Sequence, residues 1–133
     1  MATTRIAACA CGQLRVACTG DPVRVSVCHC LDCQKRSGSS FAAQARWQVA
    51  DVAITGISHH LDRPGENGTM RFHFCPDCGG GLYYLPAGDP NGLVAVAVGG
   101  FADPSFPQPD YSVYEGRKHR WVAITGDGID HYD

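Results

Sequence analysis

Three cysteines within six consecutive positions constrain this chain more than any other feature of its sequence. They form the run Cys28-His29-Cys30-Leu31-Asp32-Cys33, and a polar, glycine-containing stretch follows at residues 34–40. Thiolates this close together can all bind one soft cation, and zinc takes about four ligands in a tetrahedron with sulfur at about 2.3 Å. The run supplies three ligands, so the fourth is a distant residue, a water molecule or a substrate thiol. An open fourth position is what separates a catalytic zinc site from a structural one.

Length and charge limit the class of protein. The chain has 133 residues and a formal net charge of -2, which predicts a single domain over residues 1–133 and argues against nucleic acid as a partner, since nucleic-acid-binding domains usually carry a basic excess. The N-terminus has no hydrophobic stretch of the kind a signal peptide needs. The longest apolar run, residues 93–98, is far shorter than the roughly 20 residues that span a bilayer. We therefore expect a cytoplasmic protein with no membrane partner, of an oligomeric state that the sequence does not fix.

The eight cysteines favour metal binding over disulfide bonds. Besides the central run, they form Cys9-Ala10-Cys11-Gly12 and Cys75-Pro76-Asp77-Cys78-Gly79. Close clusters chelate a metal better than they close long loops, and a reducing compartment disfavours disulfides. Cys75 and Cys78 also match a redox pair, but such pairs stand at the start of a helix, and a strand pattern follows here. Cys18 falls on the apolar face of a predicted strand and is interpreted as a small buried hydrophobe.

Alternating apolar residues predict a mainly β chain. Residues 31–37 are the one stretch expected to form a helical turn, and the dense turn formers at 62–68 end in Asn67-Gly68, a strong hairpin signal. Strands are expected within residues 13–18, 23–27, 41–49, 57–61, 70–74, 82–85 and 93–98. Trp121 is expected to close over the core. His59 and His60 are interpreted as ordinary sheet histidines, because neighbouring strand residues face opposite ways and cannot easily share one ion.

Two divisions of the clustered cysteines remain open from spacing. In the first, four cysteines from two distant turns form a closed structural site, and the central run forms a separate group of three. The four are Cys9, Cys11, Cys75 and Cys78, and the three are Cys28, Cys30 and Cys33. In the second, Cys75 and Cys78 join two of the central cysteines and leave Cys9 and Cys11 without a metal.

The order and context of the three cysteine groups resemble the glutathione-dependent formaldehyde-activating enzyme family, which includes centromere protein V. The resemblance is carried by Cys-x-Cys-Gly, Cys-His-Cys-x-x-Cys-Gln-x-x-Ser-Gly-Ser and Phe-Cys-x-x-Cys-Gly, between Cys9 and about Gly99. It implies an all-β zinc fold of several small coiled antiparallel sheets. It also implies the first division, with one structural and one catalytic zinc per chain. Residues 111–115 replace the family's usual His-containing stretch, so the substrate can differ from that of the founding member.

The resemblance implies a carbon–sulfur lyase acting on a thiol–aldehyde adduct such as S-hydroxymethylglutathione. Zinc held by Cys28, Cys30 and Cys33 would take the substrate sulfur as its fourth ligand, and coordination deprotonates a thiol. Lys35 and Arg36 are candidates for binding a glutathione carboxylate, or else they lie on a solvated turn. His29 stands between two ligands and is expected to point away from them. The competing hypotheses are a non-catalytic, zinc-stapled binding module and a zinc–thiolate redox sensor.

Overall fold

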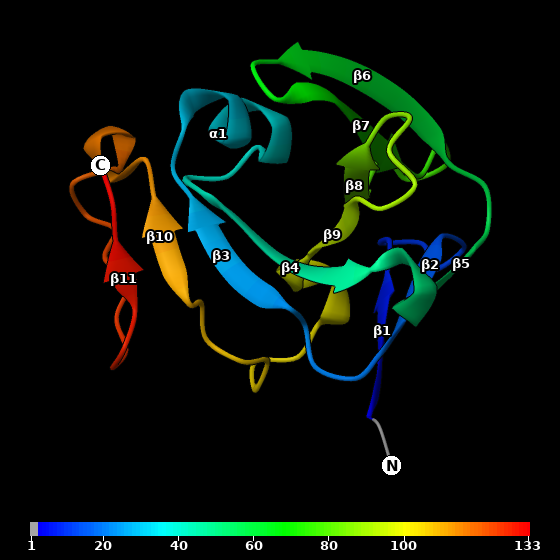
Figure 1. Ribbon diagram of the computed structural model, residues 1–133, viewed down its shortest axis with the longest axis horizontal. Helices are drawn as coiled ribbons and strands as arrows, with labels where there is room; N and C mark the ends of the chain where they lie inside the picture. Colours follow the sequence, from blue (N-terminus) through cyan, green and yellow to red (C-terminus); the bar gives the residue numbers. More distant parts are fainter. Residues whose placement is uncertain (1–2) are drawn as a thin grey trace.

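The computed structural model of the protein describes residues 3–133, and its strands form two sheets (Figure 1). The smaller sheet has the strand order β1-β2-β5, and the larger has the order β11-β10-β3-β4-β9-β8-β7-β6. Along the chain, the elements are β1 (Thr4–Ala8), β2 (Arg15–Thr19), β3 (Arg24–Cys28), α1 (Leu31–Ser37), β4 (Ala42–Gln48), η1 (Val49–Asp51), β5 (Val52–Thr55), β6 (His59–Gly65), β7 (Gly68–Phe74), β8 (Gly81–Pro86), β9 (Leu93–Ala97), η2 (Val98–Phe101), β10 (Tyr111–Val113), η3 (Glu115–Arg117) and β11 (Asp130–His131).

The predicted mainly β class is confirmed, and so is the helical turn at residues 31–37. The strands gather into fewer and larger sheets than the several small ones expected, because β3, β4, β9 and β8 hydrogen-bond edge to edge. The larger sheet curves, and α1 and the β6–β7 hairpin lie on the same side of β4 (Figure 1). Within residues 3–133, the structure contains no helix with the length and apolar character required to span a bilayer.

The core lies between the two sheets. Val16 and Cys18 of β2 are fully buried, as their alternation predicts, and they belong to the same cluster as Trp47, Val94 and Val96 of the larger sheet. Each large apolar side chain buried in this way contributes about 1.5–3 kcal/mol to folding. Burial also raises the pKa of the Cys18 thiol to about 12, so this cysteine remains a neutral, apolar residue.

The β6–β7 hairpin is longer than the sequence indicates. A turn was expected over residues 62–68, but β6 continues to Gly65, and the two strands close with Gly65 opposite Gly68. Pro64 is tolerated inside β6 because β6 is the edge strand of the larger sheet and needs hydrogen bonds on one side only. The extension carries Arg63 into a paired strand, where it lies opposite Met70.

The C-terminal part adds an edge to the larger sheet rather than a cover for the core. Strand β10 runs parallel to β3 and to β11, with Val113 opposite Cys28. The expectation that Trp121 packs over the core is wrong, because its side chain is 76% exposed. Trp121 instead lies beside the His119 ring, with the ring centroids 5.2 Å apart.

Gly56 is expected to be the glycine whose replacement by alanine is most damaging near the cysteine turns. Its φ is +98°, and an added Cβ would overlap the backbone carbonyl oxygen of Gln13. We expect Gly56→Ala to lower the free energy of unfolding by about 3 kcal/mol, from the left-handed backbone and the steric overlap together. Urea denaturation followed by circular dichroism measures this.

Gly88→Ala is the matched control for Gly56→Ala. Gly88 also has a positive φ of +78°, but no atom lies within 4 Å of the added Cβ. Only the backbone cost of about 1–2 kcal/mol is expected there. Equal losses in the two variants would contradict the steric role of Gly56.

Candidate metal centres

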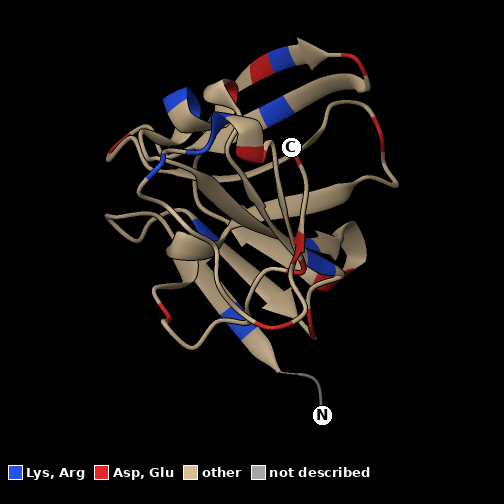
Figure 2. Cartoon of the chain, turned by 90° about the vertical axis from the view of Figure 1, so that its left-hand side faces the viewer, with Lys and Arg blue, Asp and Glu red and all other residues tan. Residues whose placement is uncertain are grey.

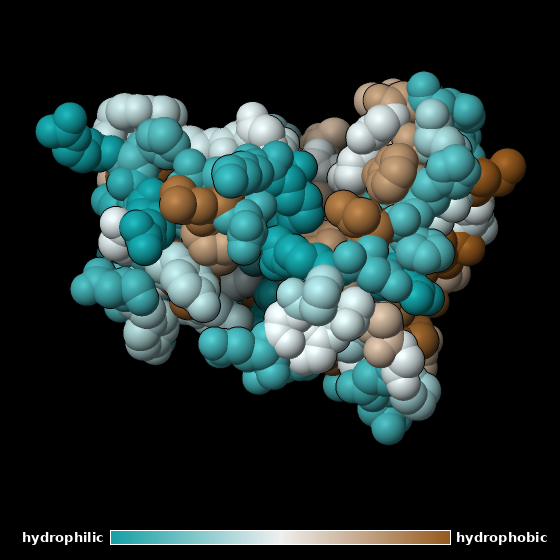
Figure 3. Space-filling view, turned by 90° about the horizontal axis from the view of Figure 1, so that it is seen from above, coloured by the Kyte–Doolittle hydropathy of each residue, from teal (hydrophilic) through white to brown (hydrophobic). Residues whose placement is uncertain are grey.

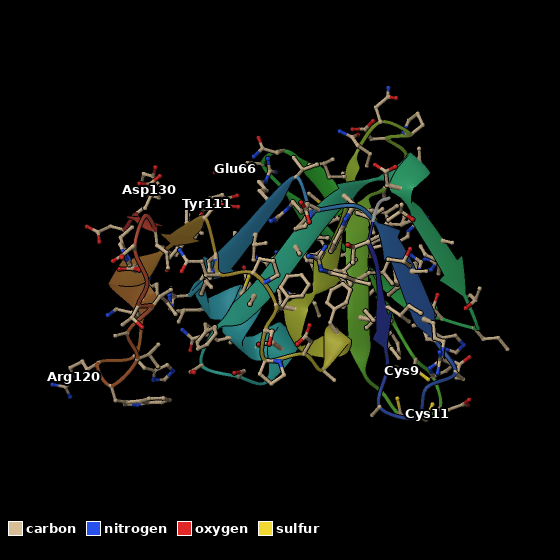
Figure 4. The ribbon with its side chains drawn as sticks, turned by 90° about the horizontal axis from the view of Figure 1, so that it is seen from below. Cys9, Cys11, Glu66, Tyr111, Arg120 and Asp130 are labelled. Atoms are coloured by element: carbon tan, nitrogen blue, oxygen red, sulfur yellow. The ribbon has the colours of Figure 1, made fainter. Side chains whose placement is uncertain are left out.

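Four cysteine sulfurs from two turns come together at one end of the molecule. The Sγ atoms of Cys9, Cys11, Cys75 and Cys78 all lie within 4.8 Å of one another. The Cys9–Cys11 and Cys11–Cys75 sulfurs are each 3.6 Å apart. A tetrahedron with metal–sulfur bonds of about 2.3 Å places its sulfurs about 3.8 Å apart. The spacing and the donor chemistry therefore fit a zinc ion, and Figure 4 shows Cys9 and Cys11 at the end opposite Tyr111 and Asp130.

Two similar backbone turns hold these cysteines. In the first, the Gly12 N–H donates to the Cys9 carbonyl at 2.9 Å, and Gly12 has a φ of +85°. In the second, the Gly79 N–H donates to the Cys75 carbonyl at 2.8 Å, and Gly79 has a φ of +76°. Both glycines adopt the left-handed conformation that bends the chain back toward its cysteines.

Gln13 links this cluster to the neighbouring loop. Its Nε2 atom donates to the Cys75 Sγ at 3.0 Å and to the Ile57 carbonyl, and its Oε1 accepts from the Ile57 N–H at 2.9 Å. Burial opposes ionisation of Cys75, but the Gln13 amide and the N–H groups of Cys78 and Asp77 outweigh it and lower the pKa of the Cys75 thiol to about 6. The turn thus favours the thiolate, which is the form that binds a metal.

The central cysteines form a separate group of three. The Sγ atoms of Cys28, Cys30 and Cys33 lie within 4.8 Å of one another, and no other His, Cys, Asp or Glu atom from residues 3–133 joins them. Cys28 ends β3, while Cys30 caps α1 by accepting the Cys33 N–H at 3.3 Å. The structure thus groups the sulfurs as in the first of the two divisions that the spacing left open.

The surroundings favour the thiolate form at one cysteine of the central group, Cys33. Hydrogen bonding from the Cys28 thiol is the largest cause that lowers the pKa of Cys33, to about 5, with further contributions from Cys30 and Arg36. An Arg36 guanidinium nitrogen lies 3.8 Å from the Cys33 Sγ. In return, the pKa of Cys28 is raised, chiefly by its hydrogen bond to Cys33 and by burial. This set of three clustered sulfur donors also suits zinc.

His29 lies outside the ligand group, on the side facing β10. Its ring is fully buried, and its Nε2 lies 2.9 Å from the Ser112 hydroxyl. Its Nδ1 is buried and has no hydrogen-bond partner within residues 3–133, and burial lowers the pKa of the imidazole. His29 therefore ties the cysteine run to β10 as a neutral side chain. His59 and His60 are exposed and join no ligand group within residues 3–133.

Gln34 fixes the same run from the other side, and sequence reasoning gave it no role. Its Nε2 donates to the carbonyls of His29 at 2.8 Å and Arg117 at 3.1 Å, and its Oε1 lies 3.0 Å from the His119 Nε2. Two of these partners are more than 80 residues away along the chain. The Cys-x-x-Cys-Gln pattern was the only signal that could have pointed to Gln34.

A cavity of about 970 Å³ adjoins the central cysteines. The cysteines themselves do not line it, but Ala42, which packs against Cys28 and Cys33, and Arg36 both do. Its walls come from α1, β4, the β6–β7 hairpin, the Gly79–Gly81 turn and β8. Figure 3 views the molecule from above, and there the surface is hollowed between its two raised parts, with hydrophobic side chains scattered among hydrophilic ones.

The comparisons with known proteins agree with this fold. A family model described as glutathione-dependent formaldehyde-activating enzyme matches residues 4–117. Among solved structures, a crystal structure of a Rhodobacter sphaeroides protein is similar, with a TM-score of 0.55 and 16% sequence identity over 96% of this chain and 99% of that chain. At this identity the likeness concerns the fold alone. A search of curated proteins found no match.

Proposed function

The chain belongs to the glutathione-dependent formaldehyde-activating enzyme family, and we propose that it is a zinc-dependent carbon–sulfur lyase. The proposed substrate is an adduct of a thiol and an aldehyde, such as S-hydroxymethylglutathione. The observation that carries this proposal is the difference between the two cysteine groups. One group has four sulfurs and the other has three, with no fourth His, Cys, Asp or Glu ligand from residues 3–133.

The two groups would hold zinc for different purposes. Cys9, Cys11, Cys75 and Cys78 would bind a structural ion that joins the turn after β1 to the turn before β8, and the closed set leaves no position for substrate. Cys28, Cys30 and Cys33 would hold a second ion, whose positive charge favours the thiolate form of a substrate sulfur.

The chain's own residues prepare the second group for this role. The Cys33 N–H donates to the Cys30 sulfur, and the Arg36 guanidinium lies beside the Cys33 sulfur. Both interactions stabilise negative charge on the thiolates before a metal binds. His29 and Gln34 hold the run against β10 and the segment at residues 117–119, so they would keep the three sulfurs in place for a metal ion.

The proposed reaction needs no further reactant. In the cleavage direction, the carbon–sulfur bond of the hydroxymethyl thioether breaks and its electron pair stays on sulfur. The hydroxyl oxygen forms the carbonyl of formaldehyde and releases its proton, which balances the charge of the thiolate. Addition of the thiol to the aldehyde is the reverse of these steps. The adjoining cavity offers room for the part of the substrate that does not react.

Metal content and rate together test the proposal. We expect two zinc ions per chain in protein purified without chelator or added zinc, measured by elemental mass spectrometry. We also expect the zinc-loaded protein to speed the exchange between formaldehyde, glutathione and their adduct, measured by exchange NMR against the same mixture without protein. The comparison is essential because thiols and formaldehyde combine without an enzyme.

Other results would favour the competing hypotheses. Two tightly held zinc ions and no rate above the uncatalysed exchange would contradict the lyase and favour a zinc-stapled binding module. Loss of one zinc with a reversible disulfide under mild peroxide, again without a rate, would favour a thiolate redox sensor.

A further inference from the structure

Two arginines from different elements line the cavity. Arg36 belongs to α1 and Arg63 to β6, and both line the cavity. Their guanidinium carbons lie 4.7 Å and 4.9 Å from the centre of the Phe72 ring, which is buried. Arg36 also lies 5.2 Å from the centre of the Tyr84 ring. Aromatic rings hold both guanidinium groups in place by cation–π contact. A ligand that binds them therefore costs little side-chain conformational entropy.

Neither guanidinium has a carboxylate partner among the residues that the structure describes. The ion pairs within residues 3–133 join Arg5 to Asp21, Arg71 to Asp62 and His131 to Glu115. Asp62 lines the cavity next to Arg63 in sequence, but Arg71 engages both of its oxygens at 2.8 Å and 2.9 Å. The carboxylate nearest in sequence is thus already satisfied, and Arg63 keeps its N–H donors for another acceptor.

The charge around the cavity is therefore positive. Lys35 adds a third cation to the wall, and Asp32 is the only acidic side chain lining it without a basic partner within residues 3–133. Figure 2 shows basic and acidic positions next to each other on the hairpin at the top of the molecule, and a further basic position on the nearby helix. The cavity wall favours a ligand with a net negative charge.

The rest of the wall is mainly apolar. It includes Leu61, Phe72, Phe74 and Leu82 from strands β6, β7 and β8, together with Phe41, which directly precedes β4. These side chains can bury an alkyl or aryl chain of a ligand. The wall thus suits an apolar chain with an anionic group at one end.

We propose that Arg63 binds a carboxylate of the ligand in this cavity, and that the ligand carries this carboxylate on an apolar chain. The planar guanidinium fork matches a carboxylate through two parallel hydrogen bonds. This inference rests on the proposed function only for the thiol end of the substrate. On that basis, the cavity would favour the aldehyde adduct of an ω-mercapto carboxylic acid over that of glutathione, with its sulfur toward the central cysteines and its carboxylate toward Arg63.

Binding of two matched probes without a thiol tests the carboxylate site directly. Hexanoate and hexan-1-ol have the same chain length and differ in charge, and each is titrated into zinc-loaded protein by heteronuclear NMR. We expect hexanoate to bind and to shift the amide signals of α1, β6 and β7. Arg63→Gln is expected to weaken hexanoate binding by about tenfold to 100-fold and to leave hexan-1-ol unchanged.

Two further variants keep the result interpretable. Arg63→Lys retains the positive charge without the fork, and we expect it to restore part of the hexanoate affinity. Arg120→Gln removes an exposed arginine far from Glu66 at the hairpin tip (Figure 4), and we expect no change. An equal loss for both probes in Arg63→Gln, or the same loss in Arg120→Gln, would overturn the assignment of Arg63.

Rates separate this inference from the lyase itself. The zinc-loaded protein should exchange formaldehyde with 6-mercaptohexanoate more efficiently than with 6-mercaptohexan-1-ol, and Arg63→Gln should remove the difference. If the protein speeds neither exchange but still binds hexanoate through Arg63, the lyase fails and the carboxylate site stands. If it speeds both equally, and hexanoate binding does not depend on Arg63, the carboxylate site fails and the lyase stands.

Discussion

Replacement of Cys75 by serine is expected to cost the protein its cooperative fold. The Cys75 sulfur is fully buried, 3.6 Å from the Cys11 sulfur and 3.0 Å from the Gln13 amide. Binding of structural zinc typically contributes about 10 kcal/mol or more to folding, whereas the net stability of a domain is about 5–15 kcal/mol. Loss of one of the four thiolates therefore removes most of the net free energy of folding. Thermal unfolding followed by circular dichroism should show a broad, low-temperature transition or none.

Cys18→Ala is the control for this variant. It also removes a buried thiol, but Cys18 lies outside both clusters. We expect it to cost about 1 kcal/mol as a small apolar truncation and to leave the zinc content unchanged. If Cys75→Ser unfolds with the same midpoint as Cys18→Ala, the four-cysteine cluster does not hold the fold together.

The cysteine groups could be found from the sequence because their spacing is local. A short segment keeps its own sulfurs near one another, so the spacing of Cys28, Cys30 and Cys33 is enough to indicate a shared metal site. The pairing of Cys9 and Cys11 with Cys75 and Cys78 is different, since spacing alone left two divisions open. It depends on how β1 and the turn before β8 approach each other, which is decided by tertiary packing.

The residues that hold these units were not predictable in the same way. Gln13 reaches a carbonyl 44 positions away, and Ser112 reaches His29 across 83 positions. Side-chain amides and hydroxyls occur everywhere in polar loops, so nothing local distinguishes these two from solvated ones. The three-residue strand β10 was missed for a related reason, because it is too short for an alternating pattern to be read.

The residues of the cavity wall were also only partly predictable from the sequence. Lys35 and Arg36 are candidates for binding a carboxylate from the sequence because they follow the cysteine run directly, but Arg63 lies in a segment whose composition predicts a turn. Only the pairing of Arg63 with Met70 in the hairpin places it on the cavity wall. The sequence does not indicate which way the side chain of a basic residue in a predicted turn points, whereas pairing in a strand fixes the face of the sheet on which it lies.

Cys30→Ser is expected to abolish the proposed activity while leaving the fold intact. The Cys30 sulfur caps α1 by accepting the Cys33 N–H, and a serine oxygen is among the best acceptors at that position, so the helix keeps its cap. A neutral hydroxyl is a far weaker zinc ligand than a thiolate. We therefore expect one zinc per chain in place of two and an unchanged unfolding midpoint. The catalysed exchange rate, after the uncatalysed rate is subtracted, should fall by about 100-fold or more.

The comparison of Cys30→Ser with Cys75→Ser then separates the two clusters. Cys75→Ser should lose fold and activity together, because the closed cluster stabilises the whole chain. Cys30→Ser should lose only activity, because the three-sulfur group adds little to folding beyond the helix cap that serine replaces. Cys18→Ala should lose neither. Full zinc content and full rate in Cys30→Ser would show that the central cysteines are not the catalytic metal site, and the lyase would then need a different centre.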